Sequence, residues 1–336
     1  MGNPSPINAR GGSIKRRHVM AMLGSALASG TSTGASAQAA FPSRPIRFVM
    51  PFPPGGAADL IGRVYAKALS EQAGQPVVPD NRPGANGVIG VQNVLRSPQD
   101  GYSVLIGSSS TLAINAATVK NLPYDPTKDF IPVGLLATLP DVLVVPADSP
   151  IRTFADFVRA ARAKPGALNY GTGSTVLQLQ GAWMNEIADI KTTDITFKGG
   201  GEVVSALMSN TVDVALLDLS AASALIRSGK LRALVLGAAE PFASLPGVPT
   251  PGQVGLKGYR GELWVMAAVA AGTARPVVDY YASQFAKAAE QPSVREWLRE
   301  RDLGYARRST AELKSMIESD IERANRLVDR LGLPRS

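Results

Sequence analysis

The sequence predicts an α/β fold of two lobes, with mixed sheets flanked by helices. Short apolar runs typical of strands alternate with helical patterns along most of the chain, which is the order that builds parallel or mixed sheets. This alternation occurs in two blocks, and a return strand and three helices follow the second. The length of 336 residues, 45% of them hydrophobic, suits two domains better than one. We therefore expect lobe 1 to comprise 41–145 and 256–336, and lobe 2 to comprise 146–255.

The first strand-turn-helix unit spans 46–69. Residues 46–50 are an apolar strand, Pro53-Pro54-Gly55-Gly56 is a turn, and apolar residues at helical spacing predict a helix that starts near Gly56 or Ala57. The first amides of a helix have no intrahelical partner, and glycines let a ligand approach the backbone. The turn therefore suits a small anion such as a carboxylate, although the same residues also serve as a plain tight connection.

A second turn of this kind follows the predicted strand 102–107. Before it, the pattern predicts a short strand at 76–79 and a helix over 88–95; after it, residues 112–117 are helical. Ser108-Ser109-Ser110-Thr111 lies between strand and helix, where hydroxyls either cap the helix or donate to a carboxylate. Sheets of this type bind ligands at the carboxyl ends of their strands, and both turns lie there.

Lobe 2 repeats the unit after a proline-interrupted stretch, 122–132, which we expect to be a loop. Thr153 and Asp156 form a capping box for a helix that ends at Ala163. Turns at 171–175 and 198–201 each join a strand to a helix. The predicted strands are 142–145, 168–170, 193–197, 212–217 and 231–236, and the further helices end near 188, 210 and 228.

The remaining chain completes the prediction. Residues 240–260 are rich in proline and glycine and form a connection, and 263–269 is an apolar strand. Helices follow at 276–290, 293–302 and 310–331. The last has an unbroken apolar stripe, which we interpret as core and not as a partner site.

The first 37 residues have the composition of a signal peptide. They contain four basic residues and no acid, an apolar run too short to span a bilayer, and Ala35-Ser36-Ala37 as a small-residue cleavage site. Arg16-Arg17 leaves a twin-arginine export route open. Removal of this segment lowers the formal net charge from +8 to +4, so the basic balance does not indicate nucleic-acid binding.

Two absences restrict the chemistry. The only histidine is His18, within the predicted leader, and the chain has no cysteine. The exported protein therefore has no Ser-His-Asp triad, no cysteine nucleophile, no thiolate or imidazole metal site and no disulfide. We expect a protein that binds and does not catalyse, with no cofactor and no metal. An exported enzyme that acts through carboxylates such as Asp59 and Asp218 is the alternative from another class.

Short stretches along nearly the whole mature chain resemble the periplasmic substrate-binding proteins of tripartite tricarboxylate transporters, the Bug-type receptors. The matching stretches include Pro51-Phe52-Pro53-Pro54-Gly55-Gly56, Asn81-Arg82-Pro83-Gly84-Ala85, Asp100-Gly101-Tyr102, Leu122-Pro123-Tyr124-Asp125-Pro126, Lys164-Pro165-Gly166-Ala167-Leu168-Asn169-Tyr170, Lys198-Gly199-Gly200, Gly229-Lys230-Leu231-Arg232-Ala233 and Leu245-Pro246-Gly247-Val248-Pro249.

The resemblance implies a two-lobed, type II-like Venus-flytrap receptor in the periplasm. Such a receptor is a monomer that is not embedded in the membrane; it closes on a small carboxylate and presents it to the membrane subunits of the transporter. A receptor that reports its ligand to a membrane sensor kinase is the alternative, which neighbouring genes would distinguish. Carried over by position, the ligand contacts would be Phe52, Pro54, Gly55, Gly56, Ala57, Ser108, Ser109, Ser110, Thr111 and Asn115 in lobe 1, and Thr172, Gly173, Ser174, Thr175, Lys198, Gly199, Gly200 and Asp218 in lobe 2.

The chain departs from the family pattern where lobe 2 would meet the ligand. The loop after Tyr170 is about two residues shorter, Gln178 takes the place of a histidine, and Leu217-Asp218 replaces an aspartate-asparagine pair. The identity of the ligand is therefore not transferred. Lys198 either pairs with the ligand or faces water. Asp218, if it lines the pocket, favours a ligand that carries an amine or amide, such as an amino acid or a nicotinamide-like acid, as well as a plain dicarboxylate.

Overall fold

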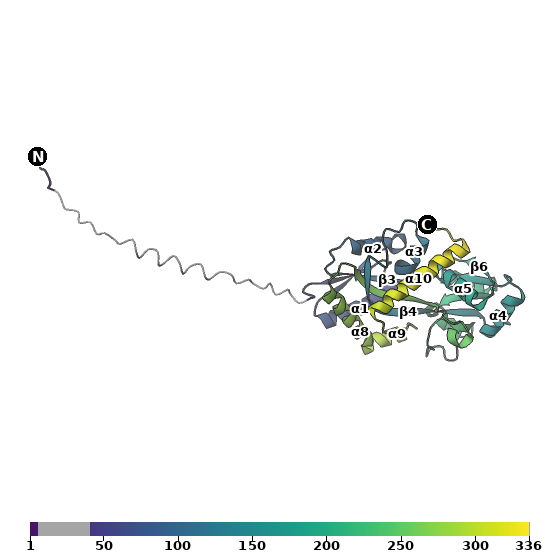
Figure 1. Ribbon diagram of the computed structural model, residues 1–336. Helices are drawn as coiled ribbons and strands as arrows, with labels where there is room; N and C mark the ends of the chain where they lie inside the picture. The colour runs from purple at the N-terminus through teal and green to yellow at the C-terminus, as the bar shows by residue number, and fades with distance from the viewer. Residues whose placement is uncertain (6–40, 336) are drawn as a thin grey trace. The chain divides into compact units, whose positions relative to one another are not determined.

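A computed structural model describes residues 1–5 and 41–335. Residues 1–5 contain no helix or strand, and the signal peptide predicted for 1–37 otherwise lies outside the described residues. Figure 1 shows the elements from Phe41 onward, which belong to one compact unit. No helix among the described residues is long and apolar enough to cross a bilayer.

The first half-sheet holds the strands of both ends of the chain. Its order is β2-β1-β3-β9-β4, with β1 parallel to β2 and β3, and β9 antiparallel to β3 and β4. Alternate residues face opposite sides, so Phe48 and Ile106 pack in one core layer, and Val49 and Leu105 in the other. The strands are β1 (Ile46–Met50), β2 (Val77–Asn81), β3 (Ser103–Ser108), β4 (Phe130–Pro146) and β9 (Glu262–Ala270).

The second half-sheet contains the middle of the chain, in the order β8-β4-β7-β5-β6. Strand β5 is parallel to β6 and β7, whereas β4 is antiparallel to β7 and β8. The carboxyl ends of the three parallel strands therefore meet at one edge. The strands are β5 (Asn169–Thr172), β6 (Thr193–Thr196), β7 (Val214–Asp218) and β8 (Leu231–Leu236).

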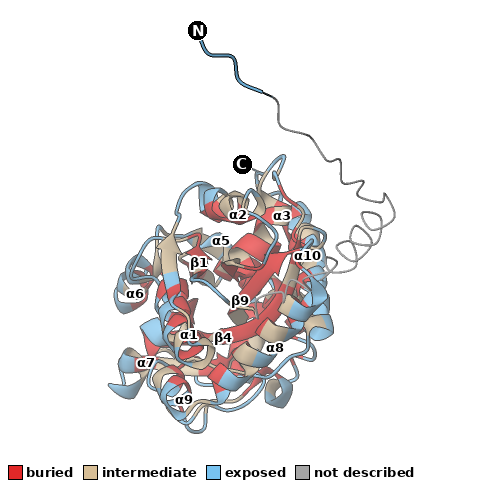
Figure 2. Cartoon of the chain, turned by 90° about the vertical axis from the view of Figure 1, so that its left-hand side faces the viewer, coloured by how far each residue is buried: buried red, intermediate tan, exposed pale blue. Residues whose placement is uncertain are grey.

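Strand β4 belongs to both half-sheets. Its first part, as far as Pro140, pairs with β9, and from Asp141 onward it pairs with β7 and then also with β8. Figure 2 shows β4 and β9 as buried strands of the interior. The prediction of a loop through Pro132, with a strand only from 142, was wrong for 130–141. Two register shifts, between Pro132 and Gly134 and between Leu135 and Ala137, accommodate the proline and the glycine within the strand.

Helices cover both half-sheets. Around the first lie α1 (Ala57–Ala73), α2 (Val88–Leu95), α8 (Arg275–Glu290) and α9 (Pro292–Arg299). Around the second lie α4 (Phe154–Ala163), α5 (Thr175–Ala188), α6 (Gly200–Met208) and α7 (Leu219–Arg227). Short helical turns are η1 (Ala85–Gly87), η2 (Ser110–Ile114), α3 (Asn115–Thr118) and η3 (Pro251–Val254). The single helix predicted over 112–117 is thus replaced by a π-helical turn that runs into one short α-helical turn.

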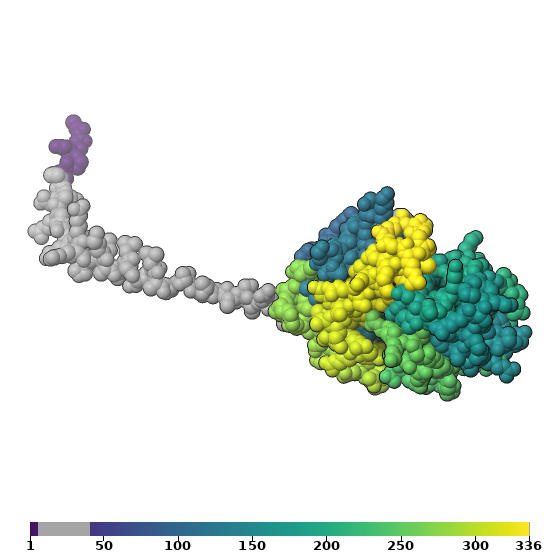
Figure 3. Space-filling view, turned by 45° about the vertical axis from the view of Figure 1, so that its right-hand side comes forward, coloured from purple at the N-terminus to yellow at the C-terminus, as the bar shows by residue number. Residues whose placement is uncertain are grey.

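The last helix, α10 (Thr310–Leu331), contacts both half-sheets or their helices. It packs on β4, η2 and α3, and also on α5. In Figure 3 it lies as a yellow ridge against both the blue and the teal segments. Its stripe residues Leu313, Ile317 and Ala324 are buried, which confirms that the stripe is core. Asp320 accepts a hydrogen bond from the Trp264 indole on β9, and Arg326 pairs with Glu186 on α5.

Candidate functional site

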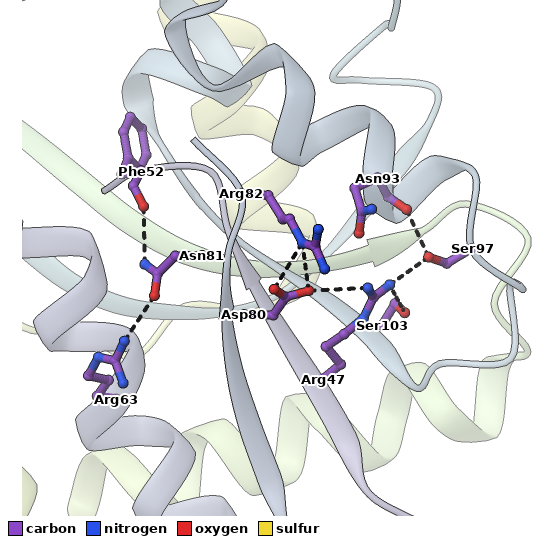
Figure 4. Close-up of polar contacts among 9 residues, drawn as sticks. All are labelled: Arg47, Phe52, Arg63, Asp80, Asn81, Arg82, Asn93, Ser97 and Ser103. Carbon is purple, nitrogen blue, oxygen red and sulfur yellow. Dashed lines mark hydrogen bonds and ion pairs between the residues drawn. The ribbon is translucent and has the colours of Figure 1, made fainter. Parts of the chain in front are cut away.

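Hydrogen bonds to Asp59 and Asn81 hold the backbone of the turn that precedes α1. Helix α1 begins after Gly56, and no side chain caps its first amides. The carboxylate of Asp59 accepts hydrogen bonds from the Gly55 amide at 2.9 Å, from Arg63 and from Asn81. Figure 4 shows Asn81 between the carbonyl oxygen of Phe52 and the guanidinium of Arg63. These contacts fix the backbone of the turn while the helix amides stay available.

The same contacts determine the charge of Asp59. Burial opposes its ionisation, but the hydrogen bonds from Arg63, Gly55 and Asn81 outweigh burial, so the pKa of Asp59 lies below its usual value. The side chain is 2% exposed and has three donors. Asp59 is therefore an ionised anchor inside the turn and not a group that faces a ligand.

In the hydroxyl-rich turn after β3, some side chains form hydrogen bonds within the turn or to neighbouring turns, and others border a pocket. The Thr111 hydroxyl accepts from the Ser108 amide at 3.0 Å and donates back to the Ser108 carbonyl oxygen. Asn115 donates to the carbonyl oxygen of Asn86 and to Tyr124, so it ties the turn to η1. Thr111 is fully buried, whereas Ser110 is half-buried and borders the two pockets described next.

A pocket of about 350 Å³ lies over the start of α1. It brings together two predicted turns and strand residues from β4 and β9, and no charged residue lines it. Its lining is Phe52, Pro53, Pro54, Gly56, Ala57, Ala58, Ser108, Ser109, Ser110, Leu139, Leu263, Trp264 and Val265.

A second pocket, of about 390 Å³, joins residues of the first half to the start of α5. It too has no charged lining residue. It contains the predicted residues Phe52, Ser110, Asn115 and Thr175, together with Asn86, Ile114, Thr118, Val176, Gln178, Leu333 and Pro334.

Two turns of the second half-sheet pack tightly against one another. A Cβ atom at Gly173 would lie 2.7 Å from the carbonyl carbon of Gly199, so only glycine permits this contact. The Ser174 hydroxyl accepts from the Leu177 amide as the cap of α5, and Glu202 accepts from the Lys198 amide. Thr172 is fully buried, and its hydroxyl has no hydrogen-bond partner among the described residues.

The structure thus brings many of the predicted residues together but not all of them. Neither pocket includes the predicted residues Gly55, Thr111, Thr172, Gly173, Ser174, Lys198, Gly199, Gly200 or Asp218. The sequence reasoning did not include Leu139, Leu263, Asn86 or the tail residues Leu333 and Pro334 among the site residues. Trp264 lines the first pocket, whereas Tyr170 is fully buried in the core.

The junction between the half-sheets is acidic. Asp141 of β4 is 1% exposed, its amide donates to the Gly261 carbonyl oxygen at 2.7 Å, and its carbonyl oxygen accepts from the Gly237 amide. Burial raises the pKa of Asp141 well above its usual value, and the nearby carboxyl groups of Asp218 and Glu262 raise it further, against a hydrogen bond from Tyr259. The raised pKa favours the protonated form of this buried carboxyl group.

The chemistry available at the site is that of binding. The pockets offer backbone amides, hydroxyls and apolar walls, and within the described ranges no cluster of carboxyl or imidazole groups is arranged to hold a metal ion. Backbone amides at a helix start, together with serine hydroxyls, are suited to hold a small anion.

The fold and the site define a two-lobed solute-binding protein of the periplasmic binding protein class. The family profile described as "Tripartite tricarboxylate transporter family receptor" matches residues 61–333. The chain belongs to this family, as the sequence resemblance had indicated.

Relatives and solved structures agree with this assignment. A UPF0065 protein from the tcbD-tcbE intergenic region of Pseudomonas sp. (strain P51) is 37% identical over 318 residues, which is 94% of each chain. A TctC solute-binding protein from Polaromonas, without ligand, has a TM-score of 0.78 at 26% identity and covers 86% of this chain and 99% of its own. MatC from Rhodopseudomonas palustris, with bound malate, has a TM-score of 0.66 at 27% identity, with coverage of 86% and 100%. A second R. palustris protein, with adipate, has a TM-score of 0.69 at 28% identity, with coverage of 87% and 98%.

Proposed function

We propose that this protein captures a small organic carboxylate between its two lobes in the periplasm and delivers it to the membrane subunits of a tripartite tricarboxylate-type transporter. The lobes would correspond to the two half-sheets with their helices, with the division within β4 at Asp141 and not after residue 145, and the junction at Asp141 would act as the hinge. The binding residues would be those of the four turns at the carboxyl ends of the strands.

One observation carries this proposal. The uncapped start of α1 and the serines after β3 converge on a pocket that no charged residue lines. The amino end of a helix carries a partial positive charge, which attracts an anion without a fixed counter-ion. Relatives crystallised with malate and adipate are bound to carboxylates of a size that suits such a pocket.

Binding is tested by isothermal titration of the purified protein with malate, adipate and other mono- and dicarboxylates. We expect at least one to bind and to raise the melting temperature, since a ligand of the folded state stabilises it by mass action. The double variant Ser109→Ala, Thr172→Ala should bind that ligand about tenfold more weakly or worse, because two hydroxyl donors are lost.

The matched control is Thr211→Ala, Ser228→Ala, which removes two exposed hydroxyls from the far ends of α6 and α7. This control should leave the affinity unchanged. Absence of binding across the carboxylates at millimolar concentration would contradict the proposed function. Delivery is tested separately: loss of uptake of the identified ligand on deletion of the neighbouring transporter membrane genes supports it, and unchanged uptake contradicts it.

A further inference from the structure

One face of the second half-sheet, beneath α5, carries a group of buried polar side chains that lack partners. Tyr170 and Thr172 of β5 are two residues apart and therefore face this same side of the sheet. The register places Asp218 of β7 opposite Asp141 of β4 on that side. Gln180 of α5 lies above them. We call Asp141, Tyr170, Thr172, Gln180 and Asp218 the polar seam.

The polar seam is where hydrogen bonding is least complete. It supplies five of the ten buried side-chain oxygen atoms that have no partner among the described residues, namely Asp141 Oδ1, Tyr170 Oη, Thr172 Oγ1, Gln180 Oε1 and Asp218 Oδ1. Buried polar groups are ordinarily paired, so each exception needs a reason. Two of the five are carboxyl oxygens and one is an amide oxygen, so the seam lacks donors more than acceptors.

Asp218 differs from the compensated buried aspartates of the molecule. Asp59 and Asp320 each accept from at least one arginine and one further donor. Asp218 has no ion pair and no hydrogen bond to its carboxylate in the part of the chain that the structure describes. Burial raises its pKa, which reflects the cost of a charge without a counter-ion.

Asp218 is also the least buried member of the seam. It is only partly buried, whereas Asp141, Tyr170 and Thr172 are almost completely buried. It ends β7 at the same edge where Thr172 ends β5 and where the Lys198 turn follows β6. Ligands of open α/β sheets bind at this edge.

We propose that the ligand carries a protonated amine in addition to its carboxylate, and that the carboxylate of Asp218 binds this amine. The ligand is then an amino acid or a closely related aminocarboxylate. This inference rests on the proposed function and specifies its substrate class. The carboxylate of the ligand would meet the amides and serines of the first half, and the ammonium group would meet the second.

A plain dicarboxylate fits this half of the site less well. Its second carboxylate would lie near the carboxyl group of Asp218, and two like charges repel strongly where water is excluded. An ammonium group supplies both the missing donors and the missing positive charge.

Matched ligand pairs test the inference. The affinity of the purified protein is measured by isothermal titration for succinate and aspartate, glutarate and glutamate, and adipate and 2-aminoadipate. In at least one pair the amino member should bind about tenfold more tightly or better, as expected for a charged hydrogen bond. N-acetylation of that amino acid removes the positive charge, so it should lower the affinity of the unmodified protein by a similar factor.

The variant Asp218→Asn should abolish the preference for the amino member. Asp194→Asn is the matched control, because Asp194 is a half-buried carboxyl on the same sheet face, held by Gln178 at 3.3 Å, and its removal should keep the preference. Should Asp218→Asn fail to fold, the N-acetyl comparison on the unmodified protein still decides the question of the amine.

Each outcome has a separate meaning. Equal binding within every pair, or a preference for the unsubstituted acids, would overturn the aminocarboxylate inference and leave the carboxylate receptor intact. A preference that survives Asp218→Asn, or that disappears equally in Asp194→Asn, would overturn the role of Asp218. Absence of binding by all six acids would overturn both this inference and the binding of such carboxylates.

Discussion

The turns on the two sides of the site treat their acidic residues in opposite ways. In the first half, Asp59 lies behind the turn, accepts from an arginine, an asparagine and a backbone amide, and presents none of its charge to the pocket. In the second half, Asp218 lies at the edge of the sheet without a compensating group among the described residues. The polar groups of the first side are paired without a ligand, whereas on our proposal a ligand would pair those of the second.

The largest predicted effect concerns Asp59, which holds the turn on the first side of the site. We expect Asp59→Ala to lower the free energy of unfolding by about 2–4 kcal/mol, because it leaves the Gly55 amide, Asn81 and Arg63 without their common acceptor. Urea denaturation measures this change. Asp279→Ala is the control: it removes an exposed pair with Arg275 and should cost less than about 0.5 kcal/mol. Equal effects of the two substitutions would show that Asp59 is no anchor.

The turns on the second side are held by close backbone packing, whereas the turn on the first side is held by the side chain of Asp59. Gly173→Ala should cost about 1–3 kcal/mol of stability, since its methyl group would press on the Gly199 and Gly200 backbone. The displaced turns should also weaken ligand binding, which titration measures alongside denaturation. Gly252→Ala, in η3 and outside the four turns, has open space for its Cβ atom and serves as the control. If Gly173→Ala were as harmless as this control, the two turns would not need their contact.

The third effect concerns the junction, and it depends on pH. Burial and the neighbouring Asp218 and Glu262 raise the pKa of Asp141 well above its usual value in the folded protein, whereas the unfolded chain loses this proton near the ordinary value of 3.8. The folded state therefore binds more protons above that pH, and stability falls as pH rises toward the raised pKa. Asparagine does not titrate, so Asp141→Asn should gain stability relative to the unmodified protein between pH 4 and pH 8, by about 1.4 kcal/mol for each unit by which folding raises the pKa within that range.

Parallel denaturation series at the two pH values measure this difference. Asp213→Asn, on an exposed residue that accepts from the Asn169 amide, is the control and should show no such gain with pH. A stability difference for Asp141→Asn that is constant with pH would mean that the junction carboxyl group is ionised in the folded protein.

The parts of the fold that sequence predicted are those with local causes. The unit from β1 to α1 follows from apolar spacing and a Pro-Gly-Gly turn, and Thr153 with Asp156 fixed the start of α4. Strand β4 was missed between 130 and 141 because its proline and glycine are accommodated by register shifts that arise only from pairing with β9. Local pattern contains no information about such a partner.

The prediction of the site has the same limit: sequence located the turns but not their contacts. The four turns could be located because their residue types mark strand ends, but sequence could not say which hydroxyls are already engaged. Thr111 closes its own turn and Ser174 caps α5, whereas Ser109 and Ser110 line a pocket. The tail residues Leu333 and Pro334 reach the second pocket only because α10 lies across the molecule.

Strand β4 has a consequence for how the molecule folds. Each half-sheet takes a part of this one strand, so neither half has a complete set of neighbours until the strand is in place in both. Loss of either half would expose the strand that the other half uses, and α10, which packs on β4, η2, α3 and α5, would lose contacts at the same time. We therefore expect the two halves to unfold together as a single cooperative unit.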